Sequence, residues 1–338
     1  MSINILDNFY DINTTKLDLS DRQLYIFPIN ICDLINLRKL YLWNNEISQL
    51  TNYIDELINL KILDLSYNKL KKLPIEFYNL INLEELSLHY NKLTNLHTKI
   101  SDLKKLKKLW IAFNELKNIP NEICNLTNLQ ILNLSNNQLT NIPNEICNLI
   151  NLKNLDLSNN QLKSLPTEIG NLIKLQSLNL ENNQLQSLPA EICNLINLQN
   201  LNLSNNKLTN IPNEICNLIN LENLNLSNNL LQSFLTDYLI NFKNIVIINL
   251  LNNKISDLPK ELLIIKEKLF IDNTSYDINN LNINNEILIF TQCKEKISNL
   301  PINIKEIWIK SINNHLSFYD ETLLLFDKLP FNCKIKYY

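Results

Sequence analysis

Leucine and isoleucine recur along most of the chain at a fixed spacing of 23 residues. Each period contains a short segment in which apolar and polar residues alternate, as in Leu132-Asn133-Leu134. A period of two is typical of a β-strand that buries one face, so each unit is predicted to contain one short strand. Apolar residues then follow at a spacing of three, as in Ile146, Leu149 and Leu152, which favours a short helix that buries one side.

The full unit reads L-x-x-L-x-L-x-x-N-x-L followed by x-x-L-P-x-x-I-x-x-L-x-x, and eleven units can be followed along the chain. A degenerate unit begins at Thr14, and a last one begins at Ile245 after a unit that is one residue longer. Full units begin at Leu37, Leu60, Leu83, Leu106, Leu129, Leu152, Leu175, Leu198 and Leu221. Because each unit of such an array packs on its neighbours, one solenoid domain is predicted.

Asparagine and proline mark two fixed positions in the unit. The asparagines are Asn45, Asn68, Asn91, Asn114, Asn137, Asn160, Asn183, Asn206, Asn229 and Asn253, and Arg22 replaces them in the first unit. An amide there can donate to and accept from backbone groups where the chain turns, which predicts a hydrogen-bonded ladder inside the solenoid. Eight of the ten prolines, from Pro28 to Pro259, occupy the second position, where proline ends a strand and prepares a turn. Three units replace this proline, with Thr51, His97 and Leu235.

Gly170 is the single glycine of the chain. Phosphate-binding loops and dinucleotide-binding fingerprints each require several glycines at fixed spacing, so both are excluded. Backbone positions with left-handed geometry must therefore be filled by asparagine, the next most tolerant residue.

These units resemble the leucine-rich-repeat family, and in particular the 23-residue class of Ras-suppressor, scribble-like and plant intracellular Ras-group proteins. The resemblance rests on the L-P-x-E-I-x-x-L spacing seen from Leu165 to Leu172 and covers about three-quarters of the chain. It implies an α/β fold, namely a curved right-handed solenoid with a parallel sheet on the concave face, and a scaffold or signalling role. The heavy use of Asn, Ile and Lys resembles that of proteins from AT-rich genomes, such as some protists and large DNA viruses.

Three regions follow from the repeat boundaries: an N-terminal flank at 1–13, the repeats at 14–265, and a tail at 266–338. The tail loses the strict period but keeps echoes of it. Residues 297–304 read as the second half of a unit, 307–309 as the next strand, and 329–334 as another echo. Because terminal repeats are usually atypical, we interpret the tail as an irregular C-terminal cap; a separate functional domain is the alternative.

Charge and composition limit the classes of partner. The net charge of −3 and the isoelectric point of about 5.8 argue against nucleic acid, whose phosphates require a basic surface. Residues 1–13 lack the basic and apolar regions of a secretory signal, and no apolar run reaches the roughly 20 residues that span a bilayer. Seven cysteines, an odd number, favour free thiols in a reducing compartment. We therefore expect a cytoplasmic monomer without cofactor or membrane contact, in the host cytoplasm if it is viral.

Candidate catalytic and metal-binding residues are few. The three histidines lack metal-ligand spacing. Five cysteines share one repeat position, where a metal or redox ladder is one interpretation and a small buried side chain is the favoured one. They are Cys32, Cys124, Cys147, Cys193 and Cys216. Cys293 and Cys333 lack the aspartate two residues later that bacterial leucine-rich-repeat ubiquitin ligases carry, and about 73 tail residues are too few for that domain. We therefore expect no catalytic residue, no metal site and no enzymatic activity.

Large aromatic residues gather on the concave face of the second to fifth units. They are Tyr41, Trp43, Tyr67, His89, Tyr90, Trp110 and Phe113, whereas later units carry asparagine and serine there. Tryptophan and tyrosine dominate binding hot spots, so these residues are predicted to bind a protein partner, with mixed charge from Lys39, Asp64, Glu85 and Lys108 around them. The simpler alternative is that the rings only pack on one another. As functions, a substrate receptor of a ubiquitin ligase and a structural component of a virion are the alternatives.

Overall fold

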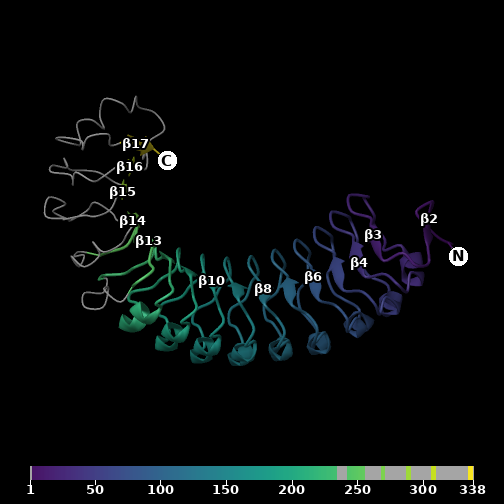
Figure 1. Cartoon of the computed structure of the whole chain (residues 1–338), viewed down its shortest axis with the longest axis horizontal. Coiled ribbons are helices and arrows are strands. Elements are labelled where there is room, and N and C mark those ends of the chain that lie inside the picture. Colours follow the sequence, from purple (N-terminus) through teal and green to yellow (C-terminus); the bar gives the residue numbers. More distant parts are fainter. Residues whose placement is uncertain are drawn as a thin grey trace. The chain divides into compact units, whose positions relative to one another are not determined.

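The computed structural model describes residues 2–233 and 242–255, together with the backbone of four further strands at 268–270, 287–290, 306–309 and 334–337. The chain divides into two compact units, Met1–Leu178 and Asn179–Tyr338. Within the described repeats, each repeat places its strand on one side and its short helix on the opposite side (Figure 1). We call the side formed by the strands the strand face.

In the first compact unit, Met1–Leu178, each strand of the repeats pairs in parallel with the strand of the next repeat. The strands are β3 (Lys16–Asp18), β4 (Lys39–Tyr41), β5 (Ile62–Asp64), β6 (Glu85–Ser87), β7 (Lys108–Trp110), β8 (Ile131–Asn133) and β9 (Asn154–Asp156). Equivalent positions lie opposite each other, so that Leu40 is opposite Leu63 and Leu63 is opposite Leu86. The sequence period of 23 residues is therefore the register of the sheet. Strand β10 (Ser177–Asn179) contains the boundary between the two units.

The second unit continues the same pattern. Its strands are β11 (Asn200–Asn202), β12 (Asn223–Asn225), β13 (Ile247–Asn249), β14 (Lys268–Phe270), β15 (Ile287–Phe290), β16 (Glu306–Ile309) and β17 (Lys334–Tyr337), each parallel to the next. Asn223 pairs with Ile247, which confirms the repeat that is one residue longer. The strand predicted at 307–309 is confirmed as part of β16. The echoes predicted at 297–304 and 329–333 lie outside the described residues.

The short helices of the described repeats are 3-10 helices of five residues. They are η1 (Ile29–Asp33), η2 (Asn52–Glu56), η3 (Ile75–Asn79), η4 (Thr98–Asp102), η5 (Asn121–Asn125), η6 (Asn144–Asn148), η7 (Thr167–Asn171), η8 (Ala190–Asn194) and η9 (Asn213–Asn217). Proline precedes seven of them, as predicted for a residue that ends extended backbone. Thr51 and His97 replace proline before η2 and η4, and each side chain accepts a hydrogen bond from the backbone N–H two residues later. Pro259 and Leu235 lie outside the described residues.

The predicted asparagine ladder is confirmed. Asn160 is buried, and its Nδ2 donates to the carbonyl oxygen of Leu157 at 3.1 Å and to that of Leu134, in the preceding repeat, at 3.0 Å. Its Oδ1 accepts from the backbone N–H of Leu139 at 2.9 Å. One side chain thus satisfies backbone groups of two repeats, at the turn where the sheet can no longer pair them.

A second asparagine ladder, which was not predicted, runs along the corner after the 3-10 helices. Asn59 Nδ2 donates to the carbonyl oxygen of Ile35 at 2.9 Å, and Asn82 Nδ2 donates to that of Ile58 at 2.8 Å. The equivalent residues Asn128, Asn151, Asn220 and Asn244 make the same bond. Where lysine takes this position, at Lys105, its ammonium donates to Oδ1 of Asn82 instead, at 2.6 Å.

The N-terminal flank forms an antiparallel hairpin of β1 (Ser2–Ile5) and β2 (Asn8–Asp11). Leu6 and Asp7 form its turn with positive φ angles of 51° and 62°, as a two-residue hairpin turn requires. Ile5 is buried, and Nδ2 of Asn30 in η1 donates to the carbonyl oxygen of Asn4 at 2.8 Å. The hairpin therefore packs on the first repeat, where the apolar interior would otherwise meet water.

Candidate protein-binding surface

The seven residues predicted to bind a partner all lie in the first compact unit, Met1–Leu178, on strands β4 to β7 and the turns that follow them. We call them the aromatic surface: Tyr41, Trp43, Tyr67, His89, Tyr90, Trp110 and Phe113. Trp43, Tyr67, Tyr90 and Phe113 are exposed, whereas Tyr41, His89 and Trp110 are half-buried. The structure therefore brings the predicted residues together on neighbouring strands, with four of the seven side chains open to solvent.

Three of the rings form a continuous stack. The ring centroids of Tyr67 and Tyr90 are 4.2 Å apart at an interplanar angle of 13°, and those of Tyr90 and Phe113 are 4.0 Å apart at 10°. Neighbouring strands are about 4.8 Å apart, so equivalent positions of consecutive repeats place the rings at stacking distance. The alternative that the aromatic residues pack on one another is thus correct for these three. Even so, Tyr67 is 49% exposed, and Tyr90 and Phe113 are each 39% exposed.

The stacked residues occupy the left-handed position of their repeats. Tyr67, Tyr90 and Phe113 have φ angles of 53°, 52° and 54°. Asparagine fills this position in seven other repeats, as predicted: Asn44, Asn136, Asn159, Asn182, Asn205, Asn228 and Asn252. The prediction that asparagine must fill it is wrong for the three aromatic residues and for Asp21 in the first repeat. A left-handed backbone costs a residue other than glycine about 1–2 kcal/mol, and asparagine less, while a stacked pair returns about 0.5–1.5 kcal/mol. The aromatic residues therefore bring the fold little stability that asparagine would not, which favours a function outside the fold.

His89 has a structural contact that sequence reasoning missed. In most described repeats an Asp or Asn side chain accepts from the backbone N–H two residues later, as Asn133 does from Ser135 at 2.9 Å. Trp110 occupies this position in its repeat and offers no such acceptor. Nδ1 of His89, in the preceding repeat, instead accepts from the backbone N–H of Ala112 at 3.1 Å. Burial lowers the pKa of His89, which keeps the imidazole neutral and able to accept this bond.

Two of the four charged residues predicted around the rings, Lys108 and Glu85, form an ion pair beside Trp110. Lys108 lies 2.9 Å from the carboxylate of Glu85, and its ammonium is 5.9 Å from the centroid of the Trp110 ring. Glu84 receives hydrogen bonds from Lys107 at 2.7 Å and from Lys61 at 3.0 Å, and these bonds lower the pKa of its carboxyl to about 2. The surface thus offers both signs of charge next to its apolar rings, which suits the orientation of a polar partner.

The serines of the later repeats correct one prediction. Ser158, Ser204 and Ser227 were expected to point outward beside the asparagines, but all three are buried. Their hydroxyls donate to the side chain two residues earlier, as Ser204 does to Oδ1 of Asn202 at 2.8 Å. The chain has already begun to turn inward there, so the third alternating position no longer faces solvent.

The five cysteines at one repeat position are free, and four of them are buried; Cys147 is half-buried. This agrees with the interpretation as small buried side chains. Burial is the main cause that raises the pKa of Cys32, Cys124 and Cys193 to about 12, so these thiols stay protonated near neutral pH. Tyr78 occupies the same position in its repeat and is also buried, so the position does not demand a small residue. Cys293 and Cys333 lie outside the described residues.

Among the residues whose placement is described, three or more His, Cys, Asp or Glu side chains nowhere gather in a way that could hold a metal ion. Within the same residues, no helix has the length and apolar character needed to cross a membrane.

Similarity to known proteins covers the repeats. A family model described as "Leucine-rich repeat region" matches residues 17–142 and 141–251. A search of curated proteins found no match. Among solved structures, the chain is similar to the leucine-rich-repeat protein LIC12759 of Leptospira interrogans, with 29% identity, a TM-score of 0.61 and coverage of 95% of both chains.

Two receptor structures are also similar. The plant peptide hormone receptor RGFR1, solved in complex with RGF2, shares 26% identity and a TM-score of 0.69 over 84% of this chain and 49% of the receptor chain. The ectodomain of the Arabidopsis thaliana receptor kinase GASSHO1/SCHENGEN3, in complex with CASPARIAN STRIP INTEGRITY FACTOR 2, shares 27% identity and a TM-score of 0.60 over 87% and 38%. The chain thus spans half or less of these receptor chains. Because the family model matches well over half of the sequence, the chain belongs to the leucine-rich-repeat family.

Proposed function

We propose that the chain is a non-enzymatic interaction module that binds a protein partner through the aromatic surface. Two similar structures were solved in complex with RGF2 and with CASPARIAN STRIP INTEGRITY FACTOR 2, which supports partner binding by this kind of array. Exposed aromatic rings on an otherwise polar face are typical of contact surfaces.

The stack of Tyr67, Tyr90 and Phe113 carries this proposal. Three consecutive repeats place a bulky ring where seven others place asparagine, at a backbone geometry that disfavours bulky side chains. Trp43 adds a further exposed ring, and Trp110 is half-buried with its ring centroid 6.4 Å from that of His89. Strands β4 to β7 span three strand spacings, about 14 Å, which suits an extended segment or one face of a helix.

The proposal includes an intracellular scaffold or signalling role for a monomer. Its support is the set of free thiols at the cysteine position, four of them buried, which suits a reducing compartment. The two alternative roles are a substrate receptor of a ubiquitin ligase and a structural component of a virion. Each differs from the proposed role in the proteins that would co-purify with the chain. Co-purified ligase subunits would indicate the first, and capsid proteins would indicate the second.

The test is an affinity purification with quantitative mass spectrometry, using the intact chain and a variant that combines Tyr67→Asn, Tyr90→Asn and Phe113→Asn. Asparagine already occupies this left-handed position in seven repeats, so the variant should fold. A matched control is Asn154→Ala, which changes an exposed residue of β9 on the same face. The proposal expects proteins that the intact chain and the control enrich and the triple variant loses. Equal enrichment by all three, with the triple variant folded, would contradict it.

A further inference from the structure

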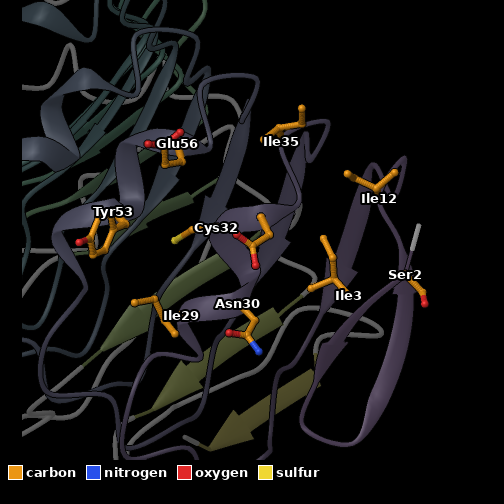
Figure 2. A pocket seen from close by; sticks show the side chains of 10 residues that line it. Ser2, Ile3, Ile12, Ile29, Asn30, Cys32, Ile35, Tyr53 and Glu56 are labelled. Atoms are coloured by element: carbon orange, nitrogen blue, oxygen red, sulfur yellow. The ribbon is translucent and has the colours of Figure 1, made fainter.

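A groove of about 680 Å³ lies between the N-terminal hairpin and the helices η1 and η2 (Figure 2). Ile3 of β1 and Ile12, directly after β2, line it on one side, whereas Ile29 and Tyr53 line it from the helices. Ile29 is 52% exposed and Tyr53 is 61% exposed, so the structure leaves considerable apolar surface in contact with water. The volume falls in the range of about 300–1,000 Å³ that is usual for binding sites.

Two carboxylates distinguish this groove from a plain apolar surface. Asp33 is the last residue of η1 and Glu56 is the last residue of η2, so they occupy equivalent positions in consecutive repeats. Neither belongs to the ion pairs found among the described residues, and the residues known to line the groove include no lysine or arginine. A cationic side chain in the groove would be attracted by both carboxylates.

Cys32 lines the same groove, and carboxylates surround its thiol. Burial is the main cause that raises the pKa of its thiol to about 12, and the negative charges of Asp33, Glu56 and Asp55 raise it further. The thiolate is therefore disfavoured here, both by burial and by neighbouring carboxylates. The groove combines apolar walls with a negative field.

We propose that this groove binds an extended segment of a protein partner that carries a lysine or arginine flanked by aliphatic side chains. The cationic group lies between Asp33 and Glu56, and the aliphatic side chains cover Ile3, Ile29 and Tyr53. The long apolar stem of lysine or arginine suits such a site, because it can lie along apolar residues while its charged end reaches the carboxylates. This site is distinct from the aromatic surface, because its helical wall belongs to η1 and η2 rather than to the strand face.

Fluorescence anisotropy with labelled peptides tests the proposal on the full chain. The probe is a fluorescein-labelled octapeptide of alternating leucine and lysine, and its counterpart alternates leucine and glutamate. We expect saturable binding of the lysine peptide, at least tenfold weaker binding to the variant Asp33→Asn/Glu56→Gln, and no saturable binding of the glutamate peptide. The variant Ile29→Ser should also weaken binding, because it removes an exposed apolar contact without touching the core.

The matched control is Asp102→Asn, because Asp102 ends η4 at the same repeat position but does not line the groove. Binding to this variant should be unchanged. A variant of the aromatic surface, Tyr90→Asn, should also bind the lysine peptide normally, which separates this site from the proposed function. Absent binding, an equal loss with Asp102→Asn, or no loss with Asp33→Asn/Glu56→Gln would overturn the proposal. Displacement of the peptide by an equal concentration of octylammonium would assign the groove to small amines and overturn the peptide as its occupant.

Discussion

The phenol oxygen of Tyr78 accepts a hydrogen bond from the backbone N–H of His97 at 3.1 Å. His97 stands at a position where most repeats carry proline, and proline has no N–H to donate. Tyr78 stands at the position where other repeats carry cysteine, and it is buried. These two departures from the repeat, 19 residues apart in the sequence, compensate each other. The buried phenol of Tyr78 needs a hydrogen-bond partner, and His97 in place of proline provides an N–H that donates to it.

A double-mutant cycle measures this pair. Tyr78→Phe leaves the N–H of His97 without its partner, and His97→Pro leaves the phenol of Tyr78 without its donor. Each change should lower the free energy of unfolding by about 1–3 kcal/mol, because a buried polar group loses its hydrogen bond. The combined variant should lose clearly less than the sum. Strict additivity in urea denaturation would show that the two residues are not coupled.

The asparagine ladder offers a second test, in which two asparagines of different burial are compared. Asn160→Ala should lower the free energy of unfolding by about 1–3 kcal/mol, since it removes the partner of buried backbone groups on two repeats. Asn59→Ala in the corner ladder should cost less, because its bond to the carbonyl oxygen of Ile35 is exposed and water can replace it. The opposite ranking in denaturant melts would contradict the roles assigned to the two ladders.

Most of the fold could be predicted from the sequence because every position of the unit recurs in many repeats. The strand register, the buried leucines, the asparagine ladder and the prolines before the helices all follow from that recurrence. The corner asparagines, such as Asn59 and Asn82, recur in the same way, but their period alone does not show which carbonyl oxygen each amide reaches.

Contacts that occur once could not be predicted in this way. The bond from Ala112 to His89 and the bond from His97 to Tyr78 each join departures from the repeat, so periodicity says nothing about them. The candidate site was predicted in its location, but not in its geometry. The stack of Tyr67, Tyr90 and Phe113 depends on three left-handed residues in register, and the buried serines depend on where the strand ends.

The left-handed position of the stack leads to a third prediction. Phe113→Asn should change the free energy of unfolding by less than about 1 kcal/mol, because the relief of backbone strain offsets the lost stacking. Phe113→Val should lower it by at least 1–2 kcal/mol, since a β-branched residue tolerates positive φ worst. If valine were tolerated as well as asparagine in thermal melts, the assigned backbone geometry would be wrong.

His89 should make the stability of the first compact unit, Met1–Leu178, sensitive to mild acid. Its pKa is lowered in the folded chain by burial, so the unfolded chain takes up this proton at a higher pH than the folded chain does. The stability that neutral His89 contributes is present above the unfolded pKa of about 6.5 and is lost as the pH falls through the folded pKa. The variant His89→Asn, which keeps an acceptor but cannot titrate, should lose less Tm between pH 7.5 and 5. An identical acid dependence of both chains would argue against this role.

The buried thiols should be insensitive to reductant. Free Cys124 and Cys193 contribute as small apolar side chains, so the Tm should be the same with and without reductant. Because burial raises their pKa to about 12, stability should fall as the pH rises from about 9 towards 12, where the unfolded chain loses thiol protons first. A large drop in Tm on reduction would instead indicate a disulfide between repeats.

The most direct test of the account uses isothermal titration calorimetry to measure the dissociation constant of the partner. It compares single variants of aromatic and of polar residues on the strand face. Trp43→Ala and Tyr90→Asn remove exposed rings of the aromatic surface, whereas Asn154→Ala removes an exposed polar side chain of β9. We expect each aromatic variant to weaken binding at least tenfold, which is about 1.4 kcal/mol, and Asn154→Ala to leave it within about twofold. Equal losses from all three folded variants, or a larger loss from Asn154→Ala, would contradict the claim that the aromatic surface binds the partner.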